Sequence, residues 1–187
     1  MNERITLSTT GHLSIGHEFD NGSTLTVAEC HNDLQKLGCG TVARCLSTPG
    51  SAINTMYLLY TNGAIPTITG IATGEVTPAD LTVADATINF CRVPVVHVAT
   101  ASTDTLGGNI VTFHGVTGGD PSGTGAALGT GSKVYAAALV CSVDGDLEND
   151  LLFSVATIPN GIAKVANAQV GIRWQVTVNL RLTETDQ

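Results

Sequence analysis

Apolar side chains occupy every second position of residues 172–182, which read Ile-Arg-Trp-Gln-Val-Thr-Val-Asn-Leu-Arg-Leu. Successive side chains of a β-strand point to opposite faces, so this alternation predicts a strand with one dry face and one wet face. At about 3.4 Å per residue the segment spans roughly 37 Å, which is long for a strand. The pattern favours antiparallel β structure, with Trp174 on the core side and Thr177 on the opposite side.

Shorter strand-like segments recur along the chain, and turn-forming residues separate them. Thr10-Gly11, Asp20-Asn21-Gly22 and Asn62-Gly63 are the turn signals, because Asn and Gly tolerate the positive φ of tight hairpins. About ten strands predict an all-β fold, either an antiparallel β-sandwich or a jelly-roll-like barrel. Besides residues 172–182, strands are expected at residues 4–7, 12–19, 23–27, 55–61, 65–71, 93–99, 109–116, 133–141, 149–158 and 163–169.

One short helix is expected near residues 32–46. Asn32 is a good N-cap residue, and Gln35 stands where a capping box has Glu or Gln. Leu34 and several later apolar residues fall on one helical face. Gly38 and Gly40 weaken the middle of this helix by about 1 kcal/mol each.

Composition fits a single β domain that is partly covered by other subunits. The chain has no repeat of fixed period and no clear linker, so residues 1–187 are expected to form one β-sandwich domain, with residues 1–30 as a candidate N-terminal arm. Only 13% of the residues are charged, about half the usual share, and 43% are hydrophobic. Because the centres of protein interfaces are poor in charge, this composition favours subunit contacts.

Charge excludes two classes of partner. The net charge is −8, and the eight Lys and Arg residues are scattered singly along the chain. Nucleic-acid binding requires clustered cations that neutralise phosphates, so no nucleic-acid partner is expected. An acidic protein is also repelled by anionic lipid, and the longest apolar run, residues 134–141, is far too short to span a membrane.

Cysteines and the N-terminus indicate synthesis in a reducing cytoplasm. The five cysteines are odd in number and irregularly spaced, which favours buried free thiols over a disulfide framework. The alternative, a disulfide between two of the five that forms after release into an oxidising medium, is left open by the sequence. The first residues contain no apolar stretch for a signal peptide. The cysteines are Cys30, Cys39, Cys45, Cys91 and Cys141.

Two segments resemble ligand-binding loops without their full patterns. The Gly-rich segment 118–131 suggests nucleotide binding, but a strand is expected after it, and phosphate loops need a helix there. We therefore interpret it as an exposed loop. Asp144, Asp146, Glu148 and Asp150 alternate as calcium ligands can, but the Gly and Glu of an EF-hand loop are missing. We expect a solvated acidic hairpin tip there.

No metal centre or catalytic residue is expected. Cys30, His31, Cys39 and Cys45 are zinc-ligand types, but no Cys-x-x-Cys pair occurs among them. The chain has no Gly-x-Ser-x-Gly elbow, and the histidines in strands, His97 and His114, have no evident Ser or Cys partner in sequence. We therefore expect a protein without enzymatic activity and without cofactors.

Two stretches of the chain resemble a loose class of small tailed-bacteriophage virion proteins. In the first, Ala28–Gly63, His31-Asn-Asp-Leu34 begins the expected helix, and the strand Met56-Tyr-Leu-Leu-Tyr60 follows. In the second, Val134–Leu180, Leu151-Leu-Phe153 precedes Ile162-Ala-Lys164 and a closing Ile172-Arg-Trp174 strand. Fibre, head-decoration and minor virion proteins often show this succession of helix, Tyr-strand and Ile-x-Trp strand.

The resemblance implies a virion protein without catalytic residues, made in the host cytoplasm. Its expected role is capsid decoration: a cement protein on the outer face of a phage head that bridges subunits of the major capsid protein or other virion proteins. A homo-oligomer is expected, with a trimer favoured. The alternative is a tail, neck or baseplate fibre or receptor-binding module that recognises glycans through exposed aromatic residues in loops. A third hypothesis, an enzyme of unknown type, predicts a pocket where a His and a carboxylate converge.

Overall fold

The computed structural model is all-β, with almost no helix. It describes residues 3–19, 21–34, 52–68, 76, 81, 88–95, 97–101, 110–117, 128–142 and 149–184. Nine strands lie in this part of the chain, so the expectation of about ten is wrong by a small margin. They are β1 (Glu3–Phe19), β2 (Thr24–Leu34), β3 (Thr55–Thr61), β4 (Ile88–Pro94), β5 (His97–Ala101), β6 (Ile110–Val116), β7 (Lys133–Cys141), β8 (Leu151–Ala163) and β9 (Ala168–Glu184).

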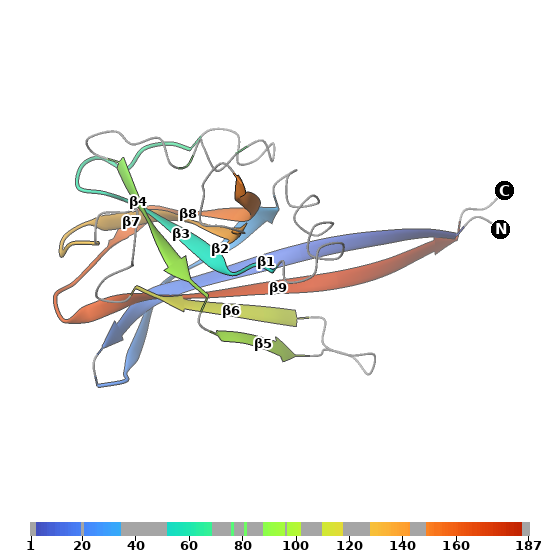
Figure 1. Ribbon diagram of the computed structural model, residues 1–187, viewed down its shortest axis with the longest axis horizontal. Coiled ribbons are helices and arrows are strands. Elements are labelled where there is room, and N and C mark those ends of the chain that lie inside the picture. Colours follow the sequence, from blue (N-terminus) through green and yellow to red (C-terminus); the bar gives the residue numbers. More distant parts are fainter. Residues whose placement is uncertain are drawn as a thin grey trace.

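Two antiparallel sheets form a sandwich-like body (Figure 1). Sheet A has the order β2-β1-β9-β6-β5, and sheet B has the order β4-β3-β7-β8. The strand β2 belongs to both sheets: it pairs with β1 as far as Asn32, and then Asp33 and Leu34 pair with β8. Because β2 pairs with a strand of each sheet, all nine strands form one continuous series in which each strand is hydrogen-bonded to the next.

The alternation predicted for residues 172–182 is confirmed where side chains are described. Ile172, Trp174 and Val176 are buried, whereas Arg173 and Gln175 are exposed. The strand is longer than expected, because β9 pairs with β1 along the whole length of both strands, from Glu3 opposite Glu184 to Phe19 opposite Ala168.

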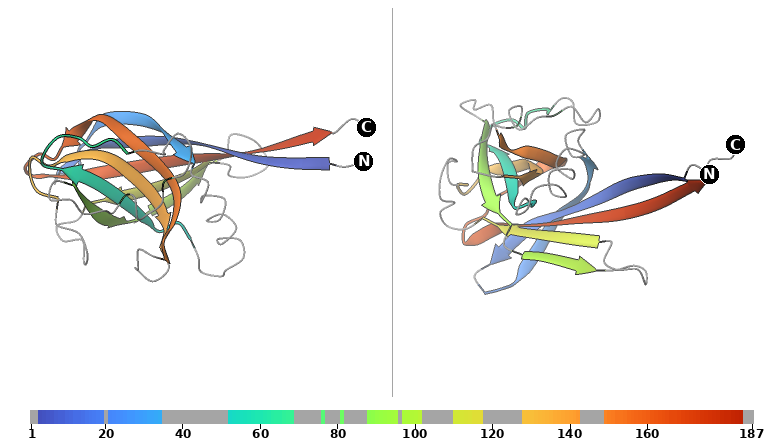
Figure 2. Two further views of the ribbon diagram at one scale, coloured as in Figure 1. Left: turned by 90° about the horizontal axis from the view of Figure 1, so that it is seen from above. Right: turned by 45° about the vertical axis from the view of Figure 1, so that its right-hand side comes forward.

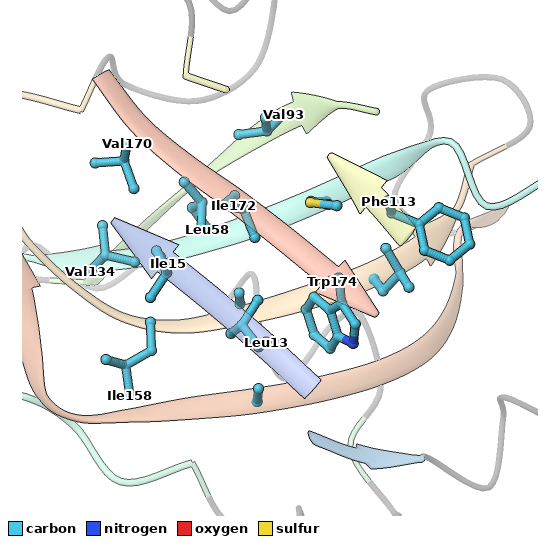
Figure 3. Packing of buried hydrophobic residues seen from close by; sticks show 14 of the residues in the cluster. Leu13, Ile15, Leu58, Val93, Phe113, Val134, Ile158, Val170, Ile172 and Trp174 are labelled. Carbon is cyan, nitrogen blue, oxygen red and sulfur yellow. The ribbon is translucent and has the colours of Figure 1, made fainter. Parts of the chain in front are cut away.

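The main core lies between the two sheets (Figure 3). Trp174 is fully buried, and its ladder neighbours are Leu13 on β1 and Phe113 on β6. Sheet B contributes residues such as Leu58 and Ile158 to the same cluster. Burying large aromatic and aliphatic side chains in this way is the main favourable contribution to folding.

A second core covers the other face of sheet B. Tyr57, Leu59 and Tyr135 pack there with Val76 and Leu81, which come from the connection between β3 and β4. The strands β3 and β7 are consequently buried on both faces. This explains the continuous apolar run in β7, which strand alternation alone would not produce.

The strands β1 and β9 extend beyond the body as a two-stranded ribbon that ends at both termini (Figures 1 and 2). The ladder between β1 and β2 stops at Gly11, and the ladder between β9 and β6 stops at Thr177. Among the residues described, the segments 3–9 and 178–184 therefore pair only with each other. We call these two segments the terminal arm.

The Asn21-Gly22 hairpin is confirmed. Gly22 has a φ of +79°, and its N–H donates to the Phe19 carbonyl at 2.9 Å. The Asn21 side chain accepts a hydrogen bond from the Ser23 N–H at 2.9 Å. Glycine adopts this left-handed backbone without steric cost, so the sequence signal and the geometry agree.

Several local predictions are wrong. Residues 32–34 lie in β2, so Asn32 is not an N-cap; residues 35–46, the rest of the expected helix, lie outside the described residues. Thr10-Gly11 continues β1 because β9 pairs across it. Residues 65–68 are not in a strand, and the strand expected at 93–99 is interrupted after Pro94, which has no N–H to donate.

Candidate functional site

Sheet A presents a polar outer face on β1, β9 and β6. In the ladder, Arg173 lies between Ser14 and His114, and in the next row Gln175 lies between His12 and Thr112. Arg173 and Gln175 are exposed, and the others are partly exposed. Hydroxyl, amide and imidazole groups predominate in these two rows, so a surface that covers this face has to supply hydrogen-bond partners.

One histidine–carboxylate pair crosses this face. The Nε2 atom of His114 lies 2.8 Å from Oε1 of Glu18, although the two residues belong to β6 and β1, with β9 between them. A Cβ atom at Gly171 would overlap the Glu18 carboxylate, so glycine at this position of β9 allows the pair to form. Sequence analysis missed the pair because the residues are 96 positions apart.

The serine of the same ladder row is too far from this pair to be activated by it. Ser14 occupies the same ladder row as His114 but lies two strands away, which is roughly 10 Å at about 4.8 Å per strand. General-base activation of a hydroxyl needs a separation of about 3 Å or one bridging water. A second pair, His12 with Glu29 at 3.8 Å, is largely exposed, and such pairs contribute little to stability.

A buried polar cluster lies on the outer side of sheet B. The Tyr57 hydroxyl donates a hydrogen bond to the Asp150 carboxylate, and the Arg92 guanidinium forms an ion pair with the same oxygen. The Asp150 side chain is fully buried. The Arg92 guanidinium also lies over the Tyr57 ring, 5.6 Å from its centroid, in cation–π geometry.

This cluster is structural in character. Burial raises the pKa of Tyr57, and the hydrogen bond to Asp150 raises it further, so the phenol stays protonated and donates. Asp150 precedes β8, and Tyr57 and Arg92 lie on β3 and β4, so the cluster joins three parts of the sheet. The expectation that Asp150 belongs to a solvated hairpin tip is wrong, whereas the other three acidic residues of that stretch lie outside the described residues.

The cysteine prediction is tested at two positions. Cys91 and Cys141 are buried thiols that form no disulfide. Burial raises the pKa of the Cys91 thiol to about 12. Of the zinc-ligand types, Cys30 and His31 are consecutive residues of β2, and Cys39 and Cys45 lie outside the described residues. No group of three or more His, Cys, Asp or Glu residues that could hold a metal ion occurs in the part of the chain that the structure describes.

The Gly-rich loop leads directly into a strand. Residues 128–132 are described, and β7 begins at Lys133, as expected from the sequence; residues 118–127 lie outside the described residues. A phosphate loop would need a helix at this point.

All eight aromatic residues fall within the described strands. Six are buried, and Phe19 and Phe90 are half-buried, so none belongs to the exposed class. Trp174 lies in the core, as predicted. The aromatic platform that a glycan-binding module would use is therefore not formed by these eight rings.

The long β1–β9 ribbon carries the most distinctive features of the molecule. At one end is the terminal arm. At the other end, beside the hairpin, Leu25 and Val27 of β2 are 56% and 47% exposed. The β1 strand spans both ends, roughly 54 Å at about 3.4 Å per residue. We therefore take the two ends of this ribbon as the candidate functional site.

The chain matches no family model, no curated protein and no solved structure. No helix in the described ranges is long and apolar enough to cross a membrane.

Proposed function

We propose that this chain is a non-enzymatic structural protein of a virion, and that it acts as a capsid decoration protein on the outer surface of a phage head. A protein that bridges subunits needs two separate contact surfaces on a rigid body. The observation that carries the proposal is the β1–β9 ribbon, with the terminal arm at one end and the exposed Leu25 and Val27 at the other.

Charge and packing support this role. The net charge of −8 suits an outward position, away from packaged DNA. Both described cores are filled by the chain's own side chains. The polar outer face of sheet A offers a further broad surface to neighbouring capsid proteins. Stable contacts of this kind usually bury more than about 1,000 Å² in total. The jelly-roll connectivity and the trimer expected from the sequence belong to this proposal.

Quantitative mass spectrometry of purified particles tests the placement. A decoration protein is expected in many copies per particle, in fixed ratio to the major capsid protein. A few copies per particle would contradict decoration and would favour the alternative, a neck, tail or baseplate module.

Binding to particles made without the protein tests the contact surface. Val27→Asp places a charge at the exposed end of the ribbon and is expected to lower occupancy at least tenfold. Val165→Asp is the matched control, because Val165 is also an exposed valine, at 39%, but lies in the turn between β8 and β9. Equal occupancy for the two variants would contradict a contact at Val27.

A specific observation favours the alternative, a receptor-binding module. The row of His12, Gln175 and Thr112 places hydrogen-bonding groups on a partly exposed sheet face, where sugar hydroxyls could bind. Binding of the purified protein to host surface polysaccharide, lost on Gln175→Ala, would support that function.

A further inference from the structure

The terminal arm has one face on which five of the eight positions are aliphatic. In the β1–β9 register Ile5 is opposite Leu182, Leu7 is opposite Leu180, and Thr9 is opposite Val178. These positions have the same parity as Leu13 and Trp174, so they continue the core face of sheet A beyond the body. The alternate positions carry Thr, Ser, Asn and Arg. Glu3 and Glu184 are opposite each other at the tip and have the same parity as the aliphatic positions.

A ribbon of this kind needs further strands. An isolated two-stranded ribbon is marginally stable in water, and three or more strands with a hydrophobic face are needed for independent stability. An open strand edge is also a template for pairing with another chain. Among the described strands none pairs with β9 beyond Thr177, so its edge from residue 178 onward offers a place for one more strand.

The sequence of this edge is complementary to itself in one register. Two copies of β9 can pair antiparallel about a two-fold axis at Leu180. Asn179 is then opposite Arg181 of the second copy, and Val178 is opposite Leu182 of the second copy. All aliphatic positions meet aliphatic positions, and no like charges are opposed.

Neighbouring registers fail on simple physical grounds. Centring the axis on Arg181 opposes two like charges, which destabilises a cross-strand pair. Centring it on Asn179 requires the second copy to pair with Thr177 and Val176. These two residues already pair with β6 on that edge. A one-residue slip places every aliphatic position opposite a polar one.

We propose that two copies of this chain pair through the arm segments Val178–Leu182 of β9, antiparallel and centred on Leu180. The pairing turns two marginal ribbons into one four-stranded sheet, β1-β9-β9-β1, whose single apolar face receives five aliphatic positions from each copy. The partner is a second copy because the edge matches itself in register, charge and polarity. The pairing rests on the proposed function and deepens it by giving the decoration protein a self-association contact; it replaces the trimer expected from the sequence with a two-fold pair.

Charge substitutions at Asn179 test this register in the full-length chain. Asn179→Glu faces Arg181 of the second copy and is expected to tighten dimerisation, whereas Asn179→Lys faces the same Arg181 and is expected to weaken it. Two symmetric pairs form per dimer, so each Kd is expected to shift by roughly 2- to 30-fold. Sedimentation equilibrium over a range of protein concentrations measures both, and each variant is the control for the other.

A rescue variant confirms the partner. Arg181→Glu combined with Asn179→Lys places opposite charges across the interface and is expected to reverse the loss caused by Asn179→Lys, giving a Kd close to that of Asn179→Glu. Because Trp174 is the only tryptophan and lies in the body core, its unchanged emission spectrum shows that each variant is folded. Leu180→Lys places two charges at the axis and is expected to abolish the dimer.

Three results would overturn the pairing: a monomer at all concentrations, a species of three times the 19.2 kDa chain mass, or shifts in the same direction for both Asn179 variants. These results leave the virion proposal standing if the protein is abundant on particles. A dimer that responds to charge as expected, from a protein found on no particle, would refute the proposed function and keep the pairing.

Discussion

At the scale of the residue, Trp174 shows how strand alternation determines burial. Its side chain is fully buried between ladder neighbours on β1 and β6, whereas the adjacent Gln175 is exposed. The indole N–H has no hydrogen-bond partner among the described residues, so packing is what holds the ring in place.

Trp174→Ala should therefore cost about 3–5 kcal/mol of unfolding free energy, through lost burial and the cavity that remains. Thr177→Ala, on the opposite face, should cost less than about 1 kcal/mol. Urea denaturation followed by circular dichroism measures both. Equal costs would contradict the one-sided burial of β9.

A second residue-scale prediction concerns the Cys91 thiol. Its pKa is raised from 9.0 unfolded to about 12 in the folded protein because it is buried. A raised folded pKa contributes stability that is complete below pH 9 and is lost as the pH rises toward 12. The free energy of unfolding should fall by roughly 1 kcal/mol per pH unit from this thiol. In denaturation series between pH 8 and pH 11, Cys91→Ala should show a shallower decline; an identical slope would contradict the assignment.

At the scale of the element, the Tyr57–Arg92–Asp150 cluster fixes how β3, β4 and the segment before β8 lie together. The sequence did not predict it, because Asp150 is part of an acidic stretch for which a solvated hairpin tip is expected. Only the pairing of β3 with β4 and β7 brings the three side chains together from positions up to 93 residues apart.

Asp150→Ala leaves the Arg92 guanidinium without its buried counter-ion and should cost roughly 3 kcal/mol. Replacing both partners, as in Arg92→Met with Asp150→Leu, should recover most of that loss, because the desolvation cost of both charges is removed. A double-mutant cycle from chemical denaturation measures the coupling. Additive losses would show that the pair contributes no net coupling.

At the scale of the whole molecule, the two sheets are joined by β2 into one hydrogen-bonded order, and one core receives residues from both. This continuity favours cooperative folding, since neither sheet can separate without exposing the core around Trp174.

We therefore expect a single unfolding transition at a fixed protein concentration. Trp174 fluorescence reports on the core and far-ultraviolet circular dichroism reports on all strands, so the two curves should coincide. Separate midpoints would show that the sheets unfold independently, and the shared strand would then not couple them.

The sequence by itself determined the all-β class, the hairpin at Asn21-Gly22, the strand β7 and the alternating faces of β9, because each depends on contacts between near neighbours in the chain. The prediction of a helix that begins at Asn32 was wrong, because Asn32 pairs with β1 as part of a strand, and this pairing outweighs its local preference for an N-cap position. Tertiary structure alone decided which strands are buried on both faces, that Glu18 meets His114, and that both termini form one projecting arm. These features depend on pairing between segments far apart in the chain, and local patterns do not encode that pairing.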